Sequence, residues 1–250
     1  MPWRETHDPY RILVSEVMLQ QTQVERVRYK YDEFLTAFPT VSDLAAASLP
    51  DVLKVWQGLG YNRRALALKK CACEIMGRFG GLFPATVDEQ ESLPGLGPYT
   101  ARAVALFAFG VVEPFIETNI RTVFIHFFFH GKERVHDREI MPLVEATLDL
   151  NDTREWYYAL MDYGVMLKRC HVNPGRRSVH HARQAPFKGS NRELRSRMLS
   201  MIMARPEGIG VDVLTALLDA EASSVEGNLR AMEREGFVVR EAGEVYVRQH

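Results

Sequence analysis

The stretch that decides the fold is Leu93–Arg121, with the sequence LPGLGPYTARAVALFAFGVVEPFIETNIR. The Pro-Gly-Leu-Gly-Pro segment at residues 94–98 cannot continue a helix, so one helix ends before it and another begins near Tyr99 and Thr100. This order predicts a helix-hairpin-helix motif. Glycines let the backbone approach a ligand closely, and unpaired N–H groups at the start of the next helix attract an anion such as phosphate. We therefore expect the hairpin to hold a nucleic-acid backbone without reading a base.

A single carboxylate, Glu117, follows this hairpin between apolar neighbours, with Thr118 and Asn119 beside it. Its position at the expected start of a helix allows two roles, a helix cap or a catalytic group. Glu, Thr and Asn are ordinary residues near a helix start, so the residues alone leave both roles open.

A second carboxylate, Glu16, lies in the apolar part of a predicted helix that runs through ILVSEVMLQQTQVERV, residues 12–27. Apolar residues recur there at spacings of three and four, and neither Pro nor Gly interrupts the pattern. An unpaired buried carboxylate is costly, so Glu16 should have a partner or hold a proton at neutral pH through a raised pKa. A structural ion pair is the alternative.

The rest of the chain predicts an all-α fold, because short amphipathic segments alternate with turns and no period-two pattern is sustained. Helices are expected over residues 27–38, 41–47, 49–57, 64–79, 101–109, 123–129, 140–150 and 156–167. From Asn191, three further helices, at 191–203, 211–218 and 223–234, lead to two strands about Gly243, the outline of a winged helix. We predict two domains, residues 1–188 and 189–250.

Charge is distributed unevenly along a chain whose formal net charge is only −1. Any DNA contact must therefore come from a local patch. One segment is rich in basic residues: Lys168, Arg169, Arg176, Arg177, Arg183, Lys188, Arg192, Arg195 and Arg197. It is either a solvated connector or a phosphate-binding surface. The predicted winged helix is acidic, which favours a packing or protein-contact role over DNA binding.

Cysteine usage argues against disulfides and metal clusters, because Cys71, Cys73 and Cys170 are too few for a four-thiolate site. His126 and His130 lie four residues apart, but no third metal ligand is evident, so core or cleft histidines are the preferred interpretation. No apolar run approaches the ~20 residues needed to cross a bilayer, and the N-terminus lacks the hydrophobic segment of a signal peptide. These patterns predict a cytoplasmic, nucleoid-associated protein.

Together, LPGLGPYTA, the following carboxylate and Asn, and the string SEVMLQQTQV at residues 15–24 resemble helix-hairpin-helix DNA glycosylases of the endonuclease III and MutY type. The resemblance covers residues 2–164 and implies two helical lobes with a cleft between them. The chain departs from the family at Glu117, where the family normally has Asp. It also lacks the cysteines of the family's iron–sulfur cluster after Gly164, so we expect no cofactor other than a monovalent cation at the hairpin.

The resemblance implies roles for individual residues. Glu16 is the expected catalytic acid, Glu117 is expected to stabilise an oxocarbenium ion at C1′, and Tyr99 and Asn119 belong to the same catalytic group. The expected base-pocket residues are Trp3, Arg4 and Tyr158. The expected DNA contacts are Gln21 and Tyr61, which would fill the gap left by a flipped base, and Gly95, Gly97, Thr100, Arg176 and Arg177.

The expected activity is that of a monofunctional DNA N-glycosylase, because Tyr99 stands where bifunctional relatives have a Schiff-base lysine. The partner would be double-stranded DNA with a mismatched or damaged base, and adenine opposite guanine or 8-oxoguanine is the preferred substrate. Thymine or uracil in a mispair with guanine is the alternative, since Tyr158 falls where adenine-specific relatives often have Gln. A non-catalytic DNA-binding or scaffold protein, with a protein partner on the winged helix, is the third hypothesis. We expect a monomer.

Overall fold

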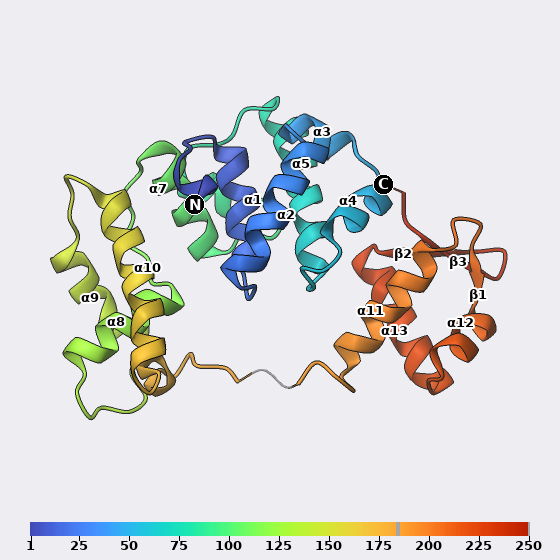
Figure 1. The fold of residues 1–250 in the computed structure, drawn as a ribbon. Helices are drawn as coiled ribbons and strands as arrows, with labels where there is room; N and C mark the ends of the chain where they lie inside the picture. The colour runs from blue at the N-terminus through green and yellow to red at the C-terminus, as the bar shows by residue number, and fades with distance from the viewer. Residues whose placement is uncertain (184–185, 250) are drawn as a thin grey trace. The chain divides into compact units, whose positions relative to one another are not determined.

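The structure is a computed structural model that describes residues 1–183 and 186–249. Helices dominate it, and a small three-stranded sheet lies near the C-terminus (Figure 1). The chain divides into two compact units, each made of two stretches of sequence. The first unit comprises Met1–Gln20 and Leu82–Arg183, and the second comprises Gln21–Gly81 and Gln184–His250.

The named elements of the first unit are all helices, and one isolated β-bridge joins Val135 and Ser178. The helices are η1 (Pro2–Arg4), α1 (Pro9–Leu19), α6 (Val87–Glu91), α7 (Pro98–Phe109), α8 (Thr118–Phe128), α9 (Asp137–Thr147), α10 (Thr153–Cys170) and η2 (Pro174–Arg177). Helix α1 packs against α7, and α8 packs against α10, α9 and η2. Buried apolar residues form these contacts. The ring of Phe115 also stacks on the ring of Tyr157 at a centroid distance of 4.0 Å.

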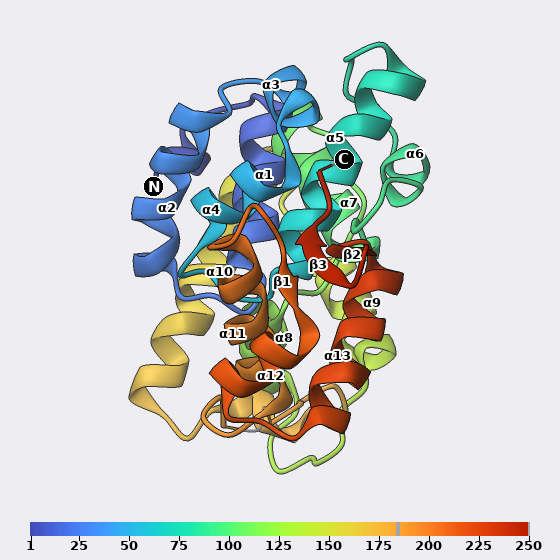
Figure 2. The ribbon, with the colours of Figure 1, turned by 90° about the vertical axis from the view of Figure 1, so that its right-hand side faces the viewer.

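The second unit combines four helices from the first half of the chain with the C-terminal residues. The four are α2 (Val24–Ala37), α3 (Val41–Ala46), α4 (Leu49–Trp56) and α5 (Arg63–Phe79). The C-terminal elements are α11 (Asn191–Met203), β1 (Ile209–Gly210), α12 (Val211–Leu218), α13 (Ala222–Glu235), β2 (Val238–Glu241) and β3 (Glu244–Val247). The antiparallel sheet has the order β1-β3-β2 and lies beside α11 and α13 (Figure 2).

Contacts inside the second unit connect the C-terminal elements to the earlier helices. Glu235 accepts hydrogen bonds from Arg63 of α5 at 2.6 Å and from Arg195 of α11 at 2.6 Å. These partners hold the pKa of the Glu235 carboxyl below its usual range, against the effect of partial burial. The acidic surface of this module is thus partly used in packing, which favours the packing role over DNA binding.

The predicted all-α class is confirmed, and most helix positions agree to within a few residues. The predicted helix through residues 12–27 is wrong in one respect, because it is broken between Leu19 and Val24. Gln21 there has a left-handed backbone, with φ of 56°. No Pro or Gly marked the break, and side-chain periodicity continues across it.

Two short elements are missing from the prediction, and one predicted helix is less buried than expected. The short helix α6 and the two-residue strand β1 have too few residues to generate a periodic pattern. The buried helix predicted over residues 123–129 is buried only through Ile125, since Phe127 and Phe128 are 46% and 52% exposed. The domain boundary at 188/189 and the winged-helix assignment stay predictions.

Candidate active site

The glycine hairpin positions the start of α7. Gly95 has φ of +81°, a left-handed conformation that residues with a Cβ rarely adopt, and Gly97 is the N-cap of α7. Leu93 and Leu96 are buried and anchor the turn in the first unit. The turn therefore fixes the direction in which the first residues of α7, including Tyr99, point.

Tyr99 donates a hydrogen bond from its hydroxyl to Oε2 of Glu16 at 2.9 Å. Glu16 is only 7% exposed, and its surroundings on α1 are apolar. Burial raises the pKa of Glu16 from 4.5 to about 7; the Tyr99 hydrogen bond and Arg4 act against this rise, and the charge of Glu117 adds to it. Both expectations for this residue, a partner and a raised pKa, are confirmed.

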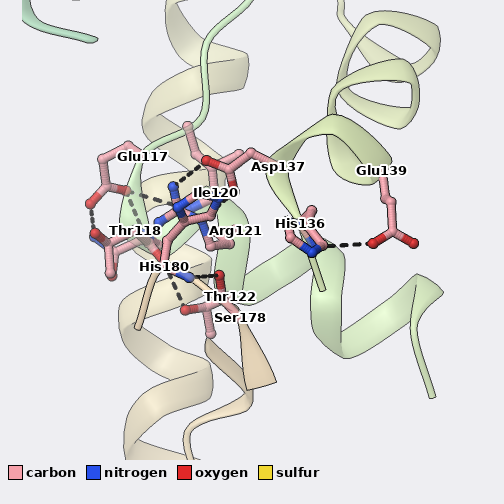
Figure 3. Close-up of polar contacts among 11 residues, drawn as sticks. Glu117, Thr118, Ile120, Arg121, Thr122, His136, Asp137, Glu139, Ser178 and His180 are labelled. Atoms are coloured by element: carbon pink, nitrogen blue, oxygen red, sulfur yellow. Dashed lines mark hydrogen bonds and ion pairs between the residues drawn. The ribbon is translucent and has the colours of Figure 1, made fainter. Parts of the chain in front are cut away.

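Glu117 is the N-cap of α8 and accepts hydrogen bonds from the helix's first N–H groups (Figure 3). Its Oε2 accepts from Asn119 N at 2.6 Å, and its Oε1 accepts from Asn119 Nδ2 at 2.8 Å. Desolvation raises the pKa of Glu117, while these N–H groups, Lys168 and Arg121 favour the carboxylate. The capping role is confirmed, and the catalytic role stays a prediction.

The two acids lie in one electrostatic environment. The charge of Glu117 adds to the rise that burial causes in the pKa of Glu16, and burial together with both carboxyls raises the pKa of Tyr99 well above its usual value. Their surroundings nevertheless differ. Glu117 sits at a helix N-terminus near cations, whereas Glu16 is enclosed by apolar side chains. This difference favours a proton on Glu16 and a negative charge on Glu117, the pairing that acid-assisted cleavage of a glycosidic bond requires.

Arg4 and Tyr158 lie in contact with each other in the first unit. The Arg4 guanidinium lies 4.4 Å from the centroid of the Tyr158 ring and makes two hydrogen bonds of 2.8 Å to Asp162. Phe107 stacks on the other face of Tyr158 at 4.6 Å. The charge of Arg4 lowers the pKa of Glu16. Burial raises the pKa of Tyr158, and the charge of Glu16 adds to this rise. Trp3, the third residue predicted for the pocket, is buried.

Gln21 and Tyr61, the residues predicted to fill the gap left by a flipped base, belong to the second unit. Both have left-handed backbones, with φ of 56° and 49°. Arg64 links their two turns, because it donates to the hydroxyl of Thr22 at 3.0 Å and to the carbonyl of Gly60 at 3.1 Å. Burial lowers the pKa of Arg64 to about 10.

The basic segment is not a single surface for phosphate. Several of its members donate to protein acceptors: Lys168 to Asn119, Arg177 to Ile125, Arg192 to Tyr61, Arg195 to Glu235 and Arg197 to Leu218. Arg177 also donates to the carbonyls of Phe129 and Lys132. The structure thus gives Arg177 a capping role at the end of α8, and the phosphate contact predicted for it stays a prediction. Arg176 is exposed, and its phosphate contact stays a prediction.

Thr100, another predicted DNA contact, has a buried side chain. Its side chain is 3% exposed, and its hydroxyl accepts a hydrogen bond from Gln20 at 3.2 Å. The side chain therefore ties α7 to the end of α1. Only the backbone N–H of Thr100, in the first turn of α7, remains for the predicted phosphate contact.

Sequence reasoning missed the inward direction of two side chains. Lys168 was assigned to the basic segment, yet its Nζ donates to Asn119 Oδ1 at 2.7 Å. Arg154 was not singled out, yet it donates to the carbonyls of Arg4, Thr6 and Phe107. The sequence holds one usable signal for Lys168: it follows Gly164 by four residues, so the two share a helix face on which a small residue permits close packing.

The cysteines do not fit an iron–sulfur cluster. Such a cluster needs four thiolates, and the chain has three cysteines. Cys71 is buried, and desolvation raises the pKa of its thiol to about 12, which opposes the thiolate form that a metal ligand needs. Across residues 1–183 and 186–249, no group of three or more His, Cys, Asp or Glu side chains is arranged to bind a metal. The monovalent cation at the hairpin stays a prediction.

No helix in the described part of the chain combines the length and the apolar content needed to cross a bilayer.

Comparisons with known proteins give one family. A sequence profile described as HhH-GPD superfamily base excision DNA repair protein matches residues 14–214. An adenine DNA glycosylase of Mycolicibacterium smegmatis is 37% identical over 181 residues, which cover 70% of this chain and 62% of that protein. A thymine/uracil-DNA glycosylase of Pyrobaculum aerophilum is 35% identical over 169 residues, which cover 65% of this chain and 74% of that protein.

One solved structure shares both the fold and recognisable sequence. The structure of a thermostable thymine-DNA glycosylase matches with a TM-score of 0.62 and 29% identity, over 66% of this chain and 78% of that chain. This chain covers a smaller share of the length of the adenine DNA glycosylases than of that solved structure. The chain spans 62% of the Mycolicibacterium smegmatis protein and 51% of an adenine DNA glycosylase of Buchnera aphidicola.

Proposed function

Because the chain belongs to the HhH-GPD superfamily of base excision DNA repair proteins, we propose that it is a DNA N-glycosylase. It flips a mispaired base out of double-stranded DNA, cleaves the N-glycosidic bond and leaves an abasic site. The observation that carries this proposal is the pairing of a desolvated acid, Glu16, with a carboxylate at a helix N-terminus, Glu117.

Glu16 protonates the leaving base. A pKa of about 7 keeps a large fraction of this carboxyl protonated at neutral pH, where an ordinary Glu would be ionised. When Glu16 gives up its proton, the hydrogen bond from Tyr99 stabilises the new carboxylate. Tyr99 therefore lowers the free energy cost of the proton transfer.

Glu117 stabilises the sugar as it becomes a cation. The departing base leaves positive charge at C1′, and a fixed carboxylate nearby lowers the energy of that state, either electrostatically or through a covalent bond to C1′. The first N–H groups of α8 hold the carboxylate in one orientation, so little reorganisation is needed. Water then adds at C1′ and gives one proton to the Glu16 carboxylate, which restores the acid and leaves the abasic product.

The reaction ends at the abasic site. Strand cleavage by the lyase route needs an amine that forms a Schiff base with the sugar, and Tyr99 offers a phenol at the position where the resembled lyases have lysine. Purified protein should therefore give no strand scission and no adduct trapped by borohydride.

Adenine opposite guanine or 8-oxoguanine is the proposed substrate, supported by the similarity to adenine DNA glycosylases. Thymine or uracil opposite guanine is a second candidate, favoured by one observation. Tyr158 is a buried aromatic residue that packs against Arg4 and Phe107, and it stands where the resemblance leads to Gln in adenine-specific enzymes. DNA is the partner, Gln21 and Tyr61 fill the gap in the duplex, and the protein acts as a monomer at the nucleoid in the cytoplasm.

The test is base release from a panel of duplexes carrying adenine, thymine, uracil or a damaged base opposite each partner base. Wild-type protein should release one class of base in single-turnover reactions, and Glu117→Gln should release none while still binding the duplex. Asp51→Asn, an exposed substitution on α4, is the matched control for loss of one carboxylate and should not change the rate. Binding of the duplexes by wild-type protein without release of any base would instead support the non-catalytic scaffold hypothesis.

A further inference from the structure

Lys168 reaches the catalytic region from α10, which lies beside α8 in the first unit (Figure 1). Its Nζ donates to Asn119 Oδ1 at 2.7 Å, and Asn119 Nδ2 donates to Glu117 Oε1 at 2.8 Å. The three side chains thus form a chain of hydrogen bonds that ends on the carboxylate. Nothing in the mechanism above assigns a task to this lysine.

We propose that Lys168 is a positioning residue for Glu117. It acts through Asn119, by fixing the orientation of the side-chain amide, and through its charge, which favours the ionised carboxylate. This inference rests on the proposed function, because it explains how Glu117 is kept in the form that the reaction requires.

The orientation of the amide follows from the chemistry of the donors. An ammonium group has three N–H donors and no acceptor, so only the oxygen of Asn119 can face it. The amide nitrogen must then point toward Glu117, which it reaches as a donor. A flipped amide would place its oxygen against the carboxylate oxygen, where the two would repel each other. Lys168 excludes that arrangement.

Close packing of the helix backbones gives Lys168 its reach. Gly164 lies one turn before Lys168 on α10, and a Cβ at this position would lie 2.4 Å from the carbonyl oxygen of Asn119 and 2.6 Å from its Cβ. The α10 backbone therefore contacts Asn119 directly. Gly164 and Lys168 lie on one face of α10. Gly164 packs against the backbone of Asn119, and Lys168 binds its side chain.

Charged and titratable groups face Glu117 from four helices. Glu16 on α1 and Tyr99 on α7 lie on one side, and Arg121 on α8 and Lys168 on α10 supply positive charge. Arg121 shares its charge with Asp137, to which it donates at 2.6 and 2.7 Å (Figure 3). Asp137 in turn lies 3.8 Å from His180. The ammonium of Lys168 is therefore a main source of positive charge for Glu117.

The direction of the expected pH effect follows. Lys168 and Arg121 lower the pKa of Glu117, against the rise caused by desolvation. Removal of the lysine charge should raise the pKa of Glu117. The acidic limb of the pH–rate profile, where Glu117 gains its proton, should then move to higher pH, while the alkaline limb, set by Glu16, should stay in place.

The experiment compares wild type, Lys168→Met and Lys168→Arg in single-turnover base release across pH, with duplex affinity measured in parallel. Lys168→Met should lower the rate at about pH 7 by roughly ten- to a hundredfold, move the acidic limb upward and leave the Kd for DNA unchanged. Lys168→Arg, which keeps the charge and the donors, should recover much of the rate. Lys132→Met removes an exposed lysine that pairs with Glu139, and it should behave as wild type.

A second readout is independent of catalysis. The pKa of the Glu117 carboxyl can be followed by carbon NMR of labelled protein without DNA, and it should be higher in Lys168→Met than in wild type. If the pKa is unchanged, or if Lys168→Met changes only the affinity for DNA and its salt dependence, the inference is overturned. Absence of base release by wild-type protein would reject the proposed function, while the NMR titration would still decide on Lys168.

Discussion

The hydroxyl of Tyr99 donates a 2.9 Å hydrogen bond to Glu16 Oε2. The donor stands at the start of the helix that follows the glycine hairpin, and the acceptor lies in the apolar part of α1, far away in sequence. The turn that is expected to hold the DNA backbone therefore also lowers the pKa of the proposed catalytic acid, against the larger rise that burial causes. Under the proposed function, binding and chemistry share one short element.

Tyr99→Phe should separate DNA binding by the hairpin from its effect on the pKa of Glu16. Loss of the donor removes an interaction that lowers the pKa of Glu16, so that pKa should rise and the alkaline limb of the pH–rate profile should move upward. The maximal rate should fall by about tenfold, because the carboxylate formed by proton transfer loses its hydrogen bond. A pH profile of single-turnover base release, with unchanged duplex affinity, measures both effects; an alkaline limb that stays in place would refute them.

Glu16→Gln should change how stability depends on pH. Folding raises the pKa of Glu16 from 4.5 to about 7, so its contribution to stability is fully present below pH 4.5 and is lost as the pH rises through about 7. Gln cannot ionise and resembles the protonated acid. The wild type should lose on the order of 3 kcal/mol of unfolding free energy relative to Glu16→Gln between acid and weakly alkaline pH. Urea titrations of both proteins across this range give the difference, and parallel stability curves would contradict the expectation.

Gly164→Ala should destabilise the first unit. The added Cβ meets the backbone of Asn119, which cannot rotate away, so α10 must shift from α8 at a cost of about 1–3 kcal/mol. Gly227→Ala is the matched control, because Gly227 also lies inside a helix and nothing lies within 4 Å of its added Cβ. That variant should gain roughly 0.5–1 kcal/mol. Thermal unfolding of the two variants should therefore shift in opposite directions.

Arg176 and Arg177 are neighbours with different expected roles. Arg177→Gln should lower the unfolding free energy by about 2 kcal/mol, because it leaves carbonyls at the end of α8 without their donor. Arg176→Gln should leave stability unchanged and weaken DNA binding, with a decrease of roughly one in the slope of log affinity against log salt. Unfolding curves and salt titrations distinguish the two, and an exchange of these outcomes would instead support Arg177 as the phosphate contact.

Sequence reasoning located the acids well because both belong to local patterns. Glu16 is surrounded by apolar residues at helical spacing, and Glu117 stands where a helix must begin, so their burial and capping follow from short-range rules. The break at Gln21 could not be predicted in this way. A left-handed residue that is not glycine is set by tertiary contacts, here through the Arg64 hydrogen bond to Thr22.

The basic segment shows a second limit of sequence reasoning. Periodicity places a lysine near a helix end but does not give the direction in which its long side chain extends. Lys168 turns inward to Asn119, whereas Arg176, a few residues later, stays exposed. Composition counts both residues alike, because it cannot separate charges that bind protein from charges that face solvent.

Helix α8 is fastened at both ends, by Arg177 on its last carbonyls and by Gly164 against Asn119 in its first turn. These two contacts restrain α8 from sliding along its axis. Under the proposed function, the reach of the acid from this first turn toward the sugar depends on its side-chain length, and Glu117 is one methylene longer than the Asp that the resembled family normally has.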